Sequence, residues 1–534
     1  MRKNFSAVIN GKQLEQNEIV DAVLNHRGIH DVASFLRPTE DDLIPFEELI
    51  GIDDAAGIVL DTIDNNGTFL IYFDVDTDGS TAGSIMYRYL SNYTDKIRTY
   101  IAKGKKHGLS ELPLSELEGV DTLIIVDSID KNPNLYQDII DLGVEIVVLD
   151  HHIVPNSLIE SNVYIHLVSS ANSYSNPDLT GAGVSWKFAA YLDYLTLNDY
   201  AEELYDLCCA GIIADMGSLE SVENRYLCYK GLSNLKNPAI KKLIGSYFFD
   251  SQSVSFSIAP AINALNRTNN NEIAMRMFMT DDLDEVDDLV DCAKEAKDAQ
   301  NAVVDALLAD LIIQGEAQAD KKCKVFFIPH ETTNMSGLLG NKLLSIYNTP
   351  VLVVHLDDNS DVIRGSMRAV GVEDFAAMIN ETGLAMATGH ELAAGFECEE
   401  DKFNDFLNAI ELKLADIEFS VNLEADVELS TEQITEGLIS QFNALNRISG
   451  SGFNAITVMV KSNDYTVSFM SKGKHLKVID NKTGVIFVKW NDGSYDTLPI
   501  DGEFVGVGTI SAAYYGRTKY RQVVLNDYTI NTTK

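Results

Sequence analysis

Short apolar runs that end in acidic or histidine-containing clusters constrain the fold of this chain more than any other feature. Three such runs are FLIYF at 69–73, TLIIV at 122–126 and EIVVL at 145–149, and segments with helical spacing separate them. Buried strands that alternate with helices are typical of a parallel sheet with helices on its faces. The sequence therefore predicts an α/β domain built on a parallel sheet.

The polar side chains that follow these strands are expected to meet at one place. The carboxyl ends of parallel strands lie at one edge of a sheet, and open α/β sheets bind ligands there. The residues concerned are Asp74, Asp76, Asp78, Asp127, Asp150, His151 and His152. A further acid, Asp215, follows the apolar run GIIA. We expect a crevice lined by carboxylates and imidazoles, gathered from separate strands.

The acids of DVDTDG at 74–79 stand at alternate positions, where they would repel one another unless they surround a cation. A solvated acidic turn is the alternative. An EF-hand calcium loop is excluded, because its twelfth position needs a glutamate and here holds Ile85. Asp150, His151 and His152 offer an oxygen and two imidazoles, which suit manganese or a similar transition metal.

The candidate ligands are numerous enough to hold two cations. Two cations roughly 3.5–4 Å apart can activate a water molecule and stabilise both the attacking and the leaving oxygen during hydrolysis of a phosphodiester. The chain contains neither a Walker P-loop nor a GxSxG nucleophile elbow. Metal-assisted phosphodiester hydrolysis is therefore the predicted chemistry.

Charge and composition limit the other classes of protein. The chain has 534 residues and a net charge of −39, which disfavours nonspecific coating of nucleic acid but not a nuclease with a local basic groove. No apolar run of membrane-spanning length and no secretory signal is recognisable. The six cysteines form no CxxC pair, which predicts buried, reduced thiols and a cytoplasmic protein without a membrane partner.

The remaining chain has three further patterns. Residues 1–67 are interpreted as short polar helices, 281–315 as a long acidic helix, and 321–418 as a second α/β segment. From 453 onward, short strands punctuated by glycine, asparagine and aspartate predict a small β-barrel. Residues 450–534 hold 10 basic and 7 acidic residues in an otherwise acidic chain.

The acidic clusters resemble the four motifs of the DHH phosphoesterase family, in the family's order. The matching segments are FDVDTDGSTA, IVDSID, LDHH and IADMGSL. Further segments, TGAGVSWKF, IAPAINALNR, RGSMR and TGHELAAGF, resemble the RecJ-like single-strand exonucleases of that family. The resemblance covers about 30–400, and the distal β segment stands where such enzymes carry an OB-fold.

The resemblance implies a 5′→3′ exonuclease that uses Mn²⁺, or alternatively Mg²⁺, to degrade single-stranded DNA to 5′-mononucleotides in recombination or repair. By position it assigns metal binding to Asp76, Asp78, Asp127, His151 and Asp215. Asp127 would bridge the metals, and Asp74 and His152 would orient the site or contact the scissile phosphate. The resemblance assigns substrate binding to six further residues, which are Arg267, Arg364, Ser366, Arg368, Gly389 and His390. A single-strand binding protein and a helicase would be partners of a monomeric enzyme.

The strand pattern and the resemblance together divide the chain into five parts. These are a lead-in (1–67), a DHH catalytic domain (68–280), a linker helix (281–320), a DHH-associated substrate-binding domain (321–418) and an OB-like nucleic-acid-binding domain (425–534). Candidate groove residues, which a solvated basic surface would explain equally well, are Lys103, Lys105, Lys106, Lys472 and Lys474, with Lys477, Lys489 and Trp490 beside the last two.

The chain departs from the family pattern at Tyr72, Gly104 and Thr388, where many members have a histidine, an arginine and a glycine. Two alternative functions remain open. A hydrolase of short oligonucleotides or cyclic dinucleotides would usually lack the distal β segment. A non-catalytic replication scaffold would typically have lost metal ligands, which are intact here.

Overall fold

The computed structural model describes residues 3–103, 108–171, 173–357, 360–492, 502–515 and 518–531. The chain forms two compact units. One comprises Asp298–Glu424 with the chain's first residues up to Ser6, and the other comprises Ala7–Lys297 with Ala425–Lys534. A single helix, α14 (Leu283–Glu316), belongs partly to each unit.

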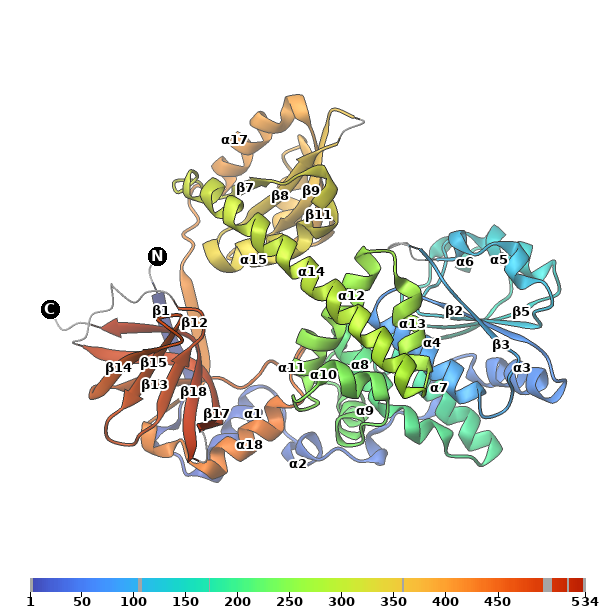
Figure 1. Cartoon of the computed structure of the whole chain (residues 1–534), viewed down its shortest axis with the longest axis horizontal. Helices are drawn as coiled ribbons and strands as arrows, with labels where there is room; N and C mark the ends of the chain where they lie inside the picture. The colour runs from blue at the N-terminus through green and yellow to red at the C-terminus, as the bar shows by residue number, and fades with distance from the viewer. Residues whose placement is uncertain are drawn as a thin grey trace. The chain divides into compact units, whose positions relative to one another are not determined.

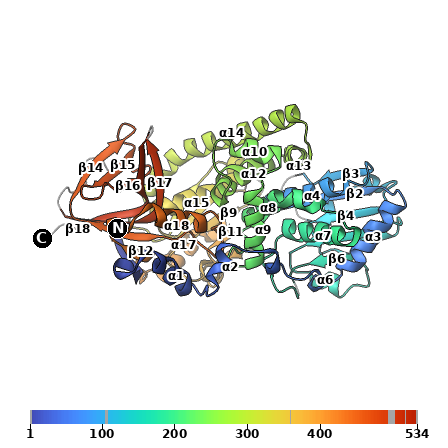
Figure 2. The ribbon, with the colours of Figure 1, turned by 90° about the horizontal axis from the view of Figure 1, so that it is seen from below.

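The predicted parallel sheet forms the core of the larger unit. Its strand order is β3-β2-β4-β5-β6, and every neighbouring pair is parallel (Figure 2). The strands are β2 (Phe69–Phe73), β3 (Ile97–Ile101), β4 (Thr122–Val126), β5 (Glu145–Asp150) and β6 (His166–Ser169). All residues of β2 and β4 are buried, because helices cover both faces of the sheet. The fold class predicted from the sequence is confirmed.

Helices pack on this sheet, and further helices that follow them in the chain form a helical region of the same unit. The helices near the sheet are α3 (Ile52–Asp64), α4 (Thr77–Leu90), α5 (Pro133–Ile140), α6 (Asn156–Ile159), α7 (Gly181–Thr196) and α8 (Tyr205–Ala214). The helices that follow are α9 (Val222–Ser233), α10 (Pro238–Ile244), α11 (Ser251–Ser253), α12 (Ala259–Arg267) and α13 (Asn271–Met279). Helix α4 contacts β2 as well as α7, α8, α12 and α13, so it links the parallel sheet to the helical region.

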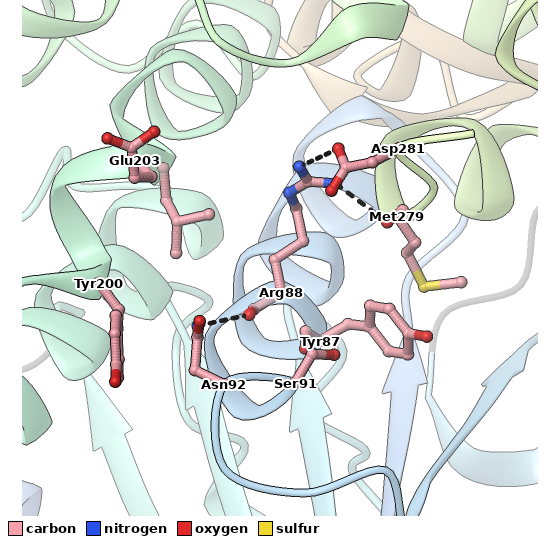
Figure 3. Close-up of a pocket in the computed structure, with 9 residues that line it drawn as sticks. Tyr87, Arg88, Ser91, Asn92, Tyr200, Glu203, Met279 and Asp281 are labelled. Atoms are coloured by element: carbon pink, nitrogen blue, oxygen red, sulfur yellow. Dashed lines mark hydrogen bonds and ion pairs between the residues drawn. The ribbon is translucent and has the colours of Figure 1, made fainter. Parts of the chain in front are cut away.

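Arg88 fixes the far end of α4, as Figure 3 shows. Its guanidinium lies 2.5 Å from Asp281 Oδ1 and donates a hydrogen bond of 3.0 Å to the carbonyl oxygen of Met279. A cation in the last turn of a helix also interacts favourably with the helix dipole. The ion pair therefore anchors the helix whose opposite end carries Asp76 and Asp78.

The smaller unit has a five-stranded sheet with the order β10-β11-β9-β8-β7. Its strands are β7 (Lys324–Phe327), β8 (Val351–Leu356), β9 (Val362–Arg368), β10 (Ala385–His390) and β11 (Ala393–Glu399). Its helices besides α14 are α15 (Ser336–Tyr347), α16 (Phe375–Asn380) and α17 (Phe403–Lys413). Two hydrophobic cores lie on opposite faces, one shared with α14 and α15 and one with α16 and α17.

The C-terminal strands form the OB-like region in a single sheet with the order β1-β12-β13-β17-β18-β16-β15-β14. Figure 2 shows β14 to β18 from a second side. The strands are β1 (Lys3–Asn10), β12 (Val421–Leu429), β13 (Val458–Ser462), β14 (Tyr465–Met470), β15 (His475–Asp480), β16 (Ile486–Lys489), β17 (Glu503–Tyr515) and β18 (Thr518–Asn531).

The interpretation of the first 67 residues as helices only is wrong at their start. Lys3–Asn10 is a strand, β1, which lies beside β12 at the edge of this sheet (Figure 1). The helices α1 (Gln16–His26) and α2 (Val32–Leu36) follow it, and α1 packs against α18 (Glu436–Asn446). An edge strand needs apolar residues on one face only, and its partner lies more than 400 positions away, so local patterns do not reveal it.

The cysteines follow the prediction with one exception. All six are free, and five are buried, whereas Cys292 on α14 is exposed. Among the described residues, no helix combines the length and the apolar character needed to cross a membrane.

Candidate metal centre

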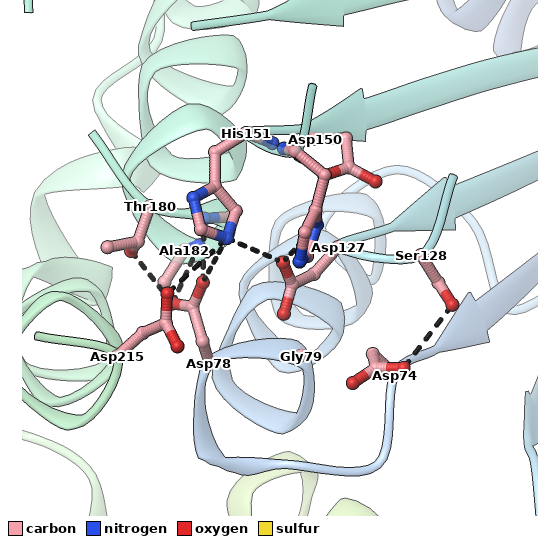
Figure 4. Close-up of polar contacts among 12 residues, drawn as sticks. Asp74, Asp78, Gly79, Asp127, Ser128, Asp150, His151, Thr180, Ala182 and Asp215 are labelled. Carbon is pink, nitrogen blue, oxygen red and sulfur yellow. Dashed lines mark hydrogen bonds and ion pairs between the residues drawn. The ribbon is translucent and has the colours of Figure 1, made fainter. Parts of the chain in front are cut away.

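The predicted carboxylates and imidazoles gather at the carboxyl edge of the parallel sheet (Figure 4). Asp74 follows β2, Asp127 follows β4, and Asp150 ends β5 directly before the two histidines. Asp76 caps the N-terminus of α4, with Asp78 in the first turn of that helix. Helices also contribute ligands, contrary to the expectation, because Asp76 and Asp78 lie at the start of α4 and Asp215 caps the C-terminus of α8.

The donor atoms fall into overlapping groups. Among the described residues, the sets compact enough to hold a metal are Asp127 with His151 and His152, Asp78 with His151 and Asp215, and Asp74 with Asp76 and Asp127. His151 Nε2 lies 3.2 Å from Asp127 Oδ1 and 3.4 Å from Asp215 Oδ2. Asp127 and His151 each belong to two groups, so these groups form one continuous centre.

Asp78 is held by the N-terminus of α7. Its carboxylate accepts hydrogen bonds from the Thr180 hydroxyl (2.8 Å), the Gly181 amide (2.7 Å) and the Ala182 amide (3.1 Å). The first amides of a helix have no intrahelical acceptor and favour a negative charge. In the sequence, TGAGVSWKF is recognisable only as a resemblance to the family, and the structure places its first residues in contact with Asp78.

Asp127 has an unusual backbone conformation and an unsatisfied oxygen. Its φ is +56°, a left-handed value that is uncommon outside glycine and that clusters at functional sites. Its Oδ1 is buried and has no hydrogen-bond partner among the described residues, although His151 Nε2 lies 3.2 Å away. A Cβ added at Gly181 would lie 2.7 Å from the Asp127 Cβ, so only glycine lets α7 approach this closely. A cation is the partner that such a buried carboxylate oxygen lacks.

Asp150 orients the loops around the centre, a role that the strand-end pattern alone did not identify. Its carboxylate accepts bonds from the backbone amides of Ile129 (2.6 Å), His151 (2.6 Å) and His152 (2.8 Å). It also lies 2.8 Å from His152 Nδ1. This bond raises the pKa of His152 to about 9, so that the imidazole is protonated at neutral pH in the metal-free protein.

The carboxylates repel one another in the absence of a cation. Burial and the negative charges of Asp215 and Asp76 hold the pKa of Asp78 well above its ordinary value. Burial and the charge of Asp78 do the same to the pKa of Asp127. Divalent cations relieve both effects, and a mixed set of carboxylates and one imidazole suits Mn²⁺. The residues therefore fit a divalent metal centre.

Tyr72 and Asp74 stand at the carboxyl end of β2. Asp74 is buried, and its Oδ1 accepts a bond of 3.3 Å from the Ser128 hydroxyl. Tyr72, which stands where many family members have a histidine, donates a bond of 2.6 Å to the carbonyl oxygen of Gly108 and stacks on Tyr100. Its hydroxyl therefore anchors the backbone at Gly108.

Two of the predicted DNA contacts, Arg267 and Lys103, lie in the part of the larger unit that precedes α14. Arg267 ends α12, donates a bond of 3.1 Å to the carbonyl oxygen of Asn263, and has a pKa lowered by burial. Lys103 is exposed and follows β3, at the same edge of the sheet as the acids. Gly104, Lys105 and Lys106 lie outside the described residues.

The sheet of the smaller unit brings four predicted substrate contacts to one face, namely Arg364, Ser366, Arg368 and His390. Arg364, Ser366 and Arg368 alternate along β9, so they point to the same side. Across the sheet, Gly395 pairs with both Ser366 and Thr388. Ala393 likewise pairs with Arg368 and with His390, which is exposed. Gly389, with a φ of +143°, separates Thr388 from His390.

The two arginines of this face differ in how far their charge is available. Arg364 forms ion pairs with Asp357 and with Glu397, the second at 3.2 Å. Arg368 donates to the Asn341 side chain and to the carbonyl oxygen of Met367, which are neutral groups. Arg368 is therefore the better candidate for an anion, and Arg364 is largely neutralised.

Basic and aromatic residues gather at one end of the C-terminal sheet. Lys472 and Lys474 are exposed in the turn between β14 and β15. His475, the first residue of β15, lies with its ring 4.9 Å from the ring of Trp490, which is 49% exposed. Lys477 follows on the same outward face of β15, and Lys489 donates to the carbonyl oxygen of Asn526.

Comparison with known proteins assigns the metal centre to a family. Residues 68–212 match the DHH family, N-terminal domain. The chain carries a DHH domain. The match spans the strands and helices that supply Asp74 to His152 and those that hold Asp78, and it ends three residues before Asp215.

Similarity to curated proteins extends beyond the DHH domain. The chain is 28% identical over 459 residues to a Bacillus subtilis protein named as the SPbeta prophage-derived single-strand DNA-specific exonuclease YorK, with 79% of each chain covered. It is 26% identical over 457 residues to the single-stranded-DNA-specific exonuclease RecJ of Bacillus subtilis, with 82% of this chain and 58% of that protein covered.

The fold around the DHH domain is that of RecJ. The crystal structure of RecJ from Thermus thermophilus in complex with Mn²⁺ superimposes with a TM-score of 0.79 and 23% sequence identity, covering 100% of this chain and 80% of that one.

Proposed function

We propose that the protein is a metal-dependent 5′→3′ exonuclease that hydrolyses single-stranded DNA to 5′-mononucleotides. The convergence of carboxylates and imidazoles on Asp127 carries this proposal, because it provides for two divalent ions beside each other. Similarity to single-strand DNA exonucleases over most of the chain supports the substrate. Such an enzyme would act on DNA in the cytoplasm, in recombination or repair.

The residues of the centre have separable tasks in this reaction. Asp76, Asp78, His151 and Asp215 would hold two divalent ions, Mn²⁺ or Mg²⁺, and Asp127 would be shared between them. When bound, these ions supply Lewis acidity and lower the pKa of water.

The groups around the ligands would position the reacting phosphate. Asp74 and Asp150 would orient the loops, and His152, fixed by Asp150, would place its imidazole beside the scissile phosphate. Carboxylates and backbone amides thus set the geometry, and hydrolysis depends on positioning rather than on a covalent intermediate.

Cationic and hydroxyl groups would bind the phosphates of the strand. Arg368, Ser366 and His390 lie on one sheet face, and Arg267 and Lys103 lie in the larger unit. Arginine presents a planar fork that matches phosphate oxygens, which favours Arg267 in the larger unit and Arg368 in the smaller unit as separate phosphate contacts. Arg364 would stabilise the face through its ion pairs rather than contact DNA.

The test of the proposal is an assay of the purified protein with Mn²⁺ on single strands labelled at either end. We expect release of labelled mononucleotide first from the 5′ end, little hydrolysis of double-stranded DNA, and loss of activity with a chelator. Preferential hydrolysis of dinucleotides would favour the oligonucleotide phosphodiesterase, and absence of hydrolysis on every substrate would favour a scaffold.

Charge reversal at the turn between β14 and β15 should separate strand binding from catalysis. In the double variant Lys472→Glu and Lys474→Glu, we expect the KM for a long single strand to rise about tenfold at moderate salt, because each lost phosphate contact weakens binding. The kcat on a dinucleotide should not change. The charge reversal Lys131→Glu, at an exposed lysine of the DHH domain and outside the C-terminal sheet, provides a control. An unchanged KM for the long strand would refute the guiding role of the turn.

A further inference from the structure

A short segment of the C-terminal region packs on the loop that presents Asp215. We define the clasp as residues 447–453, which connect α18 to the strands of the C-terminal sheet. The loop it contacts is 215–219, which leaves the end of α8. Both belong to the larger unit.

The loop is held at both of its ends. At its start, the Gly217 amide donates to the carbonyl oxygen of Ile212 (2.9 Å) after Met216 has taken a left-handed φ of +60°. At its end, the Leu219 amide donates to the carbonyl oxygen of Ser451 in the clasp (2.8 Å). The second contact is supplied by a residue more than 230 positions away in the sequence.

The clasp also limits the space around the loop. Gly452 has a φ of +70°, and a Cβ there would lie 2.2 Å from Ser218 Oγ. A Cβ at Gly450 would lie 3.2 Å from a methyl carbon of Leu219, which is itself buried. The backbone of the clasp therefore lies against Ser218 and Leu219 without intervening side chains.

Arg225 joins the clasp to the DHH-containing body. Its guanidinium is buried and donates to the carbonyl oxygens of Ile448 (2.9 Å) and Phe35 (2.7 Å). It lies 3.8 Å from the centroid of the Phe35 ring and 5.0 Å from that of Phe453. A buried arginine that bonds several carbonyl groups fixes the segments that carry them.

Arg447 and Ser251 form a second joint. The Ser251 amide and hydroxyl donate to the carbonyl oxygen of Arg447, at 3.1 and 2.7 Å. The Arg447 guanidinium donates to the carbonyl oxygens of Phe249 and Leu232. The clasp is thus fixed to helical elements on two sides and has little freedom to follow movements of the loop.

The backbone of the loop sets the position of Asp215. Its side chain is 34% exposed, compared with 0% for Asp78 and 18% for His151 in the same group. Its Oδ2 lies 3.4 Å from His151 Nε2, so a displaced loop would carry the carboxylate away from its group.

We propose that the clasp is a positioning element for Asp215, so that the C-terminal region contributes to metal binding as well as to strand binding. This inference rests on the proposed role of Asp215 as a metal ligand. It also means that deletion of 425–534 would damage both functions, whereas substitutions in the clasp test the inference alone.

The variant Gly452→Ala tests the proposal, with Gly484→Ala as its matched control. Both glycines have a left-handed φ, of +70° and +72°, but a Cβ at Gly484 meets nothing within 4 Å. The two variants therefore share the backbone strain and differ in the contact with Ser218. We expect Gly452→Ala, and not Gly484→Ala, to weaken Mn²⁺ binding about tenfold in calorimetric titrations.

Removal of the opposing side chain should restore the site. In the double variant Gly452→Ala and Ser218→Gly, the added methyl group regains space, and we expect the Mn²⁺ affinity to return to that of Gly484→Ala. If the wild type binds Mn²⁺, equal Mn²⁺ affinities in Gly452→Ala and Gly484→Ala would overturn the proposal, as would a double variant that binds Mn²⁺ as weakly as Gly452→Ala.

Hydrogen exchange separates this inference from the proposed function. Without metal, the amides of 216–219 should exchange about tenfold faster in Gly452→Ala than in Gly484→Ala, because the bond from Leu219 to Ser451 is disturbed. Unchanged exchange would overturn the positioning role even if the nuclease is active. Faster exchange in a protein that neither binds Mn²⁺ nor cleaves DNA would support the positioning of the loop and refute the nuclease.

Discussion

Replacing Asp127 by asparagine is expected to lower Mn²⁺-dependent hydrolysis of single-stranded DNA by about 10³-fold or more. Asparagine keeps the size of the side chain and removes the charge that two of the donor groups share. The affinity for Mn²⁺ should fall together with activity, which calorimetric titration measures. The metal-free variant should also unfold at a higher temperature than the wild type, because one of several repelling carboxylates is gone.

The matched control is Asp138→Asn, an exposed aspartate on α5 of the same domain. It should retain wild-type activity and Mn²⁺ affinity. Full activity of Asp127→Asn would show that Asp127 is not a required metal ligand. A lower unfolding temperature of the metal-free variant would show that the Asp127 carboxylate stabilises the fold instead of destabilising it.

Replacing Lys187 by methionine is expected to lower the free energy of unfolding by about 3–5 kcal/mol. Lys187 Nζ lies 2.7 Å from Glu223 Oε1, and both side chains are completely or almost completely buried. Burial lowers the pKa of Lys187, and the charge of Glu223 opposes this shift. Without the ammonium group, Glu223 would keep a buried charge with only the neutral donors Tyr174, Asn176 and the Ile44 amide.

Urea unfolding followed by tryptophan fluorescence measures this effect. The chain has two tryptophans, and in a Trp490→Phe background the signal comes from buried Trp186, beside Lys187 on α7. The control is Lys236→Met, which breaks an exposed pair with Glu203 and should cost less than about 1 kcal/mol. Equal decreases in the free energy of unfolding in the two variants would contradict a stabilising buried pair. Strictly additive decreases for Lys187→Met and Glu223→Gln in a double variant would contradict it as well.

The part of the site at the ends of strands was predictable from the sequence. Parallel strands end at a common edge, so the acids after β2, β4 and β5 had to meet once the three apolar runs were recognised as neighbours. The same rule does not apply to Asp215, because this residue lies at the C-terminal end of helix α8. GIIA is compatible with a strand or with a buried helix, and periodicity does not distinguish them over so few residues.

The sequence did not predict which arginine side chains keep a charge that is free of acidic neighbours and available to bind a phosphate. RGSMR places two arginines on one strand face, but only the structure shows that Asp357 and Glu397 neutralise Arg364 while Arg368 contacts neutral groups. Asp150 was likewise expected to join the other acids, and instead it accepts backbone amides of Ile129, His151 and His152. Such assignments depend on contacts between loops that no local pattern encodes.

The pairing of β1 with β12 has a consequence for synthesis of the chain. About 410 residues separate the two strands, so at 5–20 residues per second β1 leaves the ribosome roughly 20–80 s before its partner exists. The parallel sheet of the DHH domain, whose strands all lie within 69–169, can assemble during that interval. The DHH domain would therefore fold first, and β1 would stay exposed to chaperones or to other chains until β12 has been synthesised.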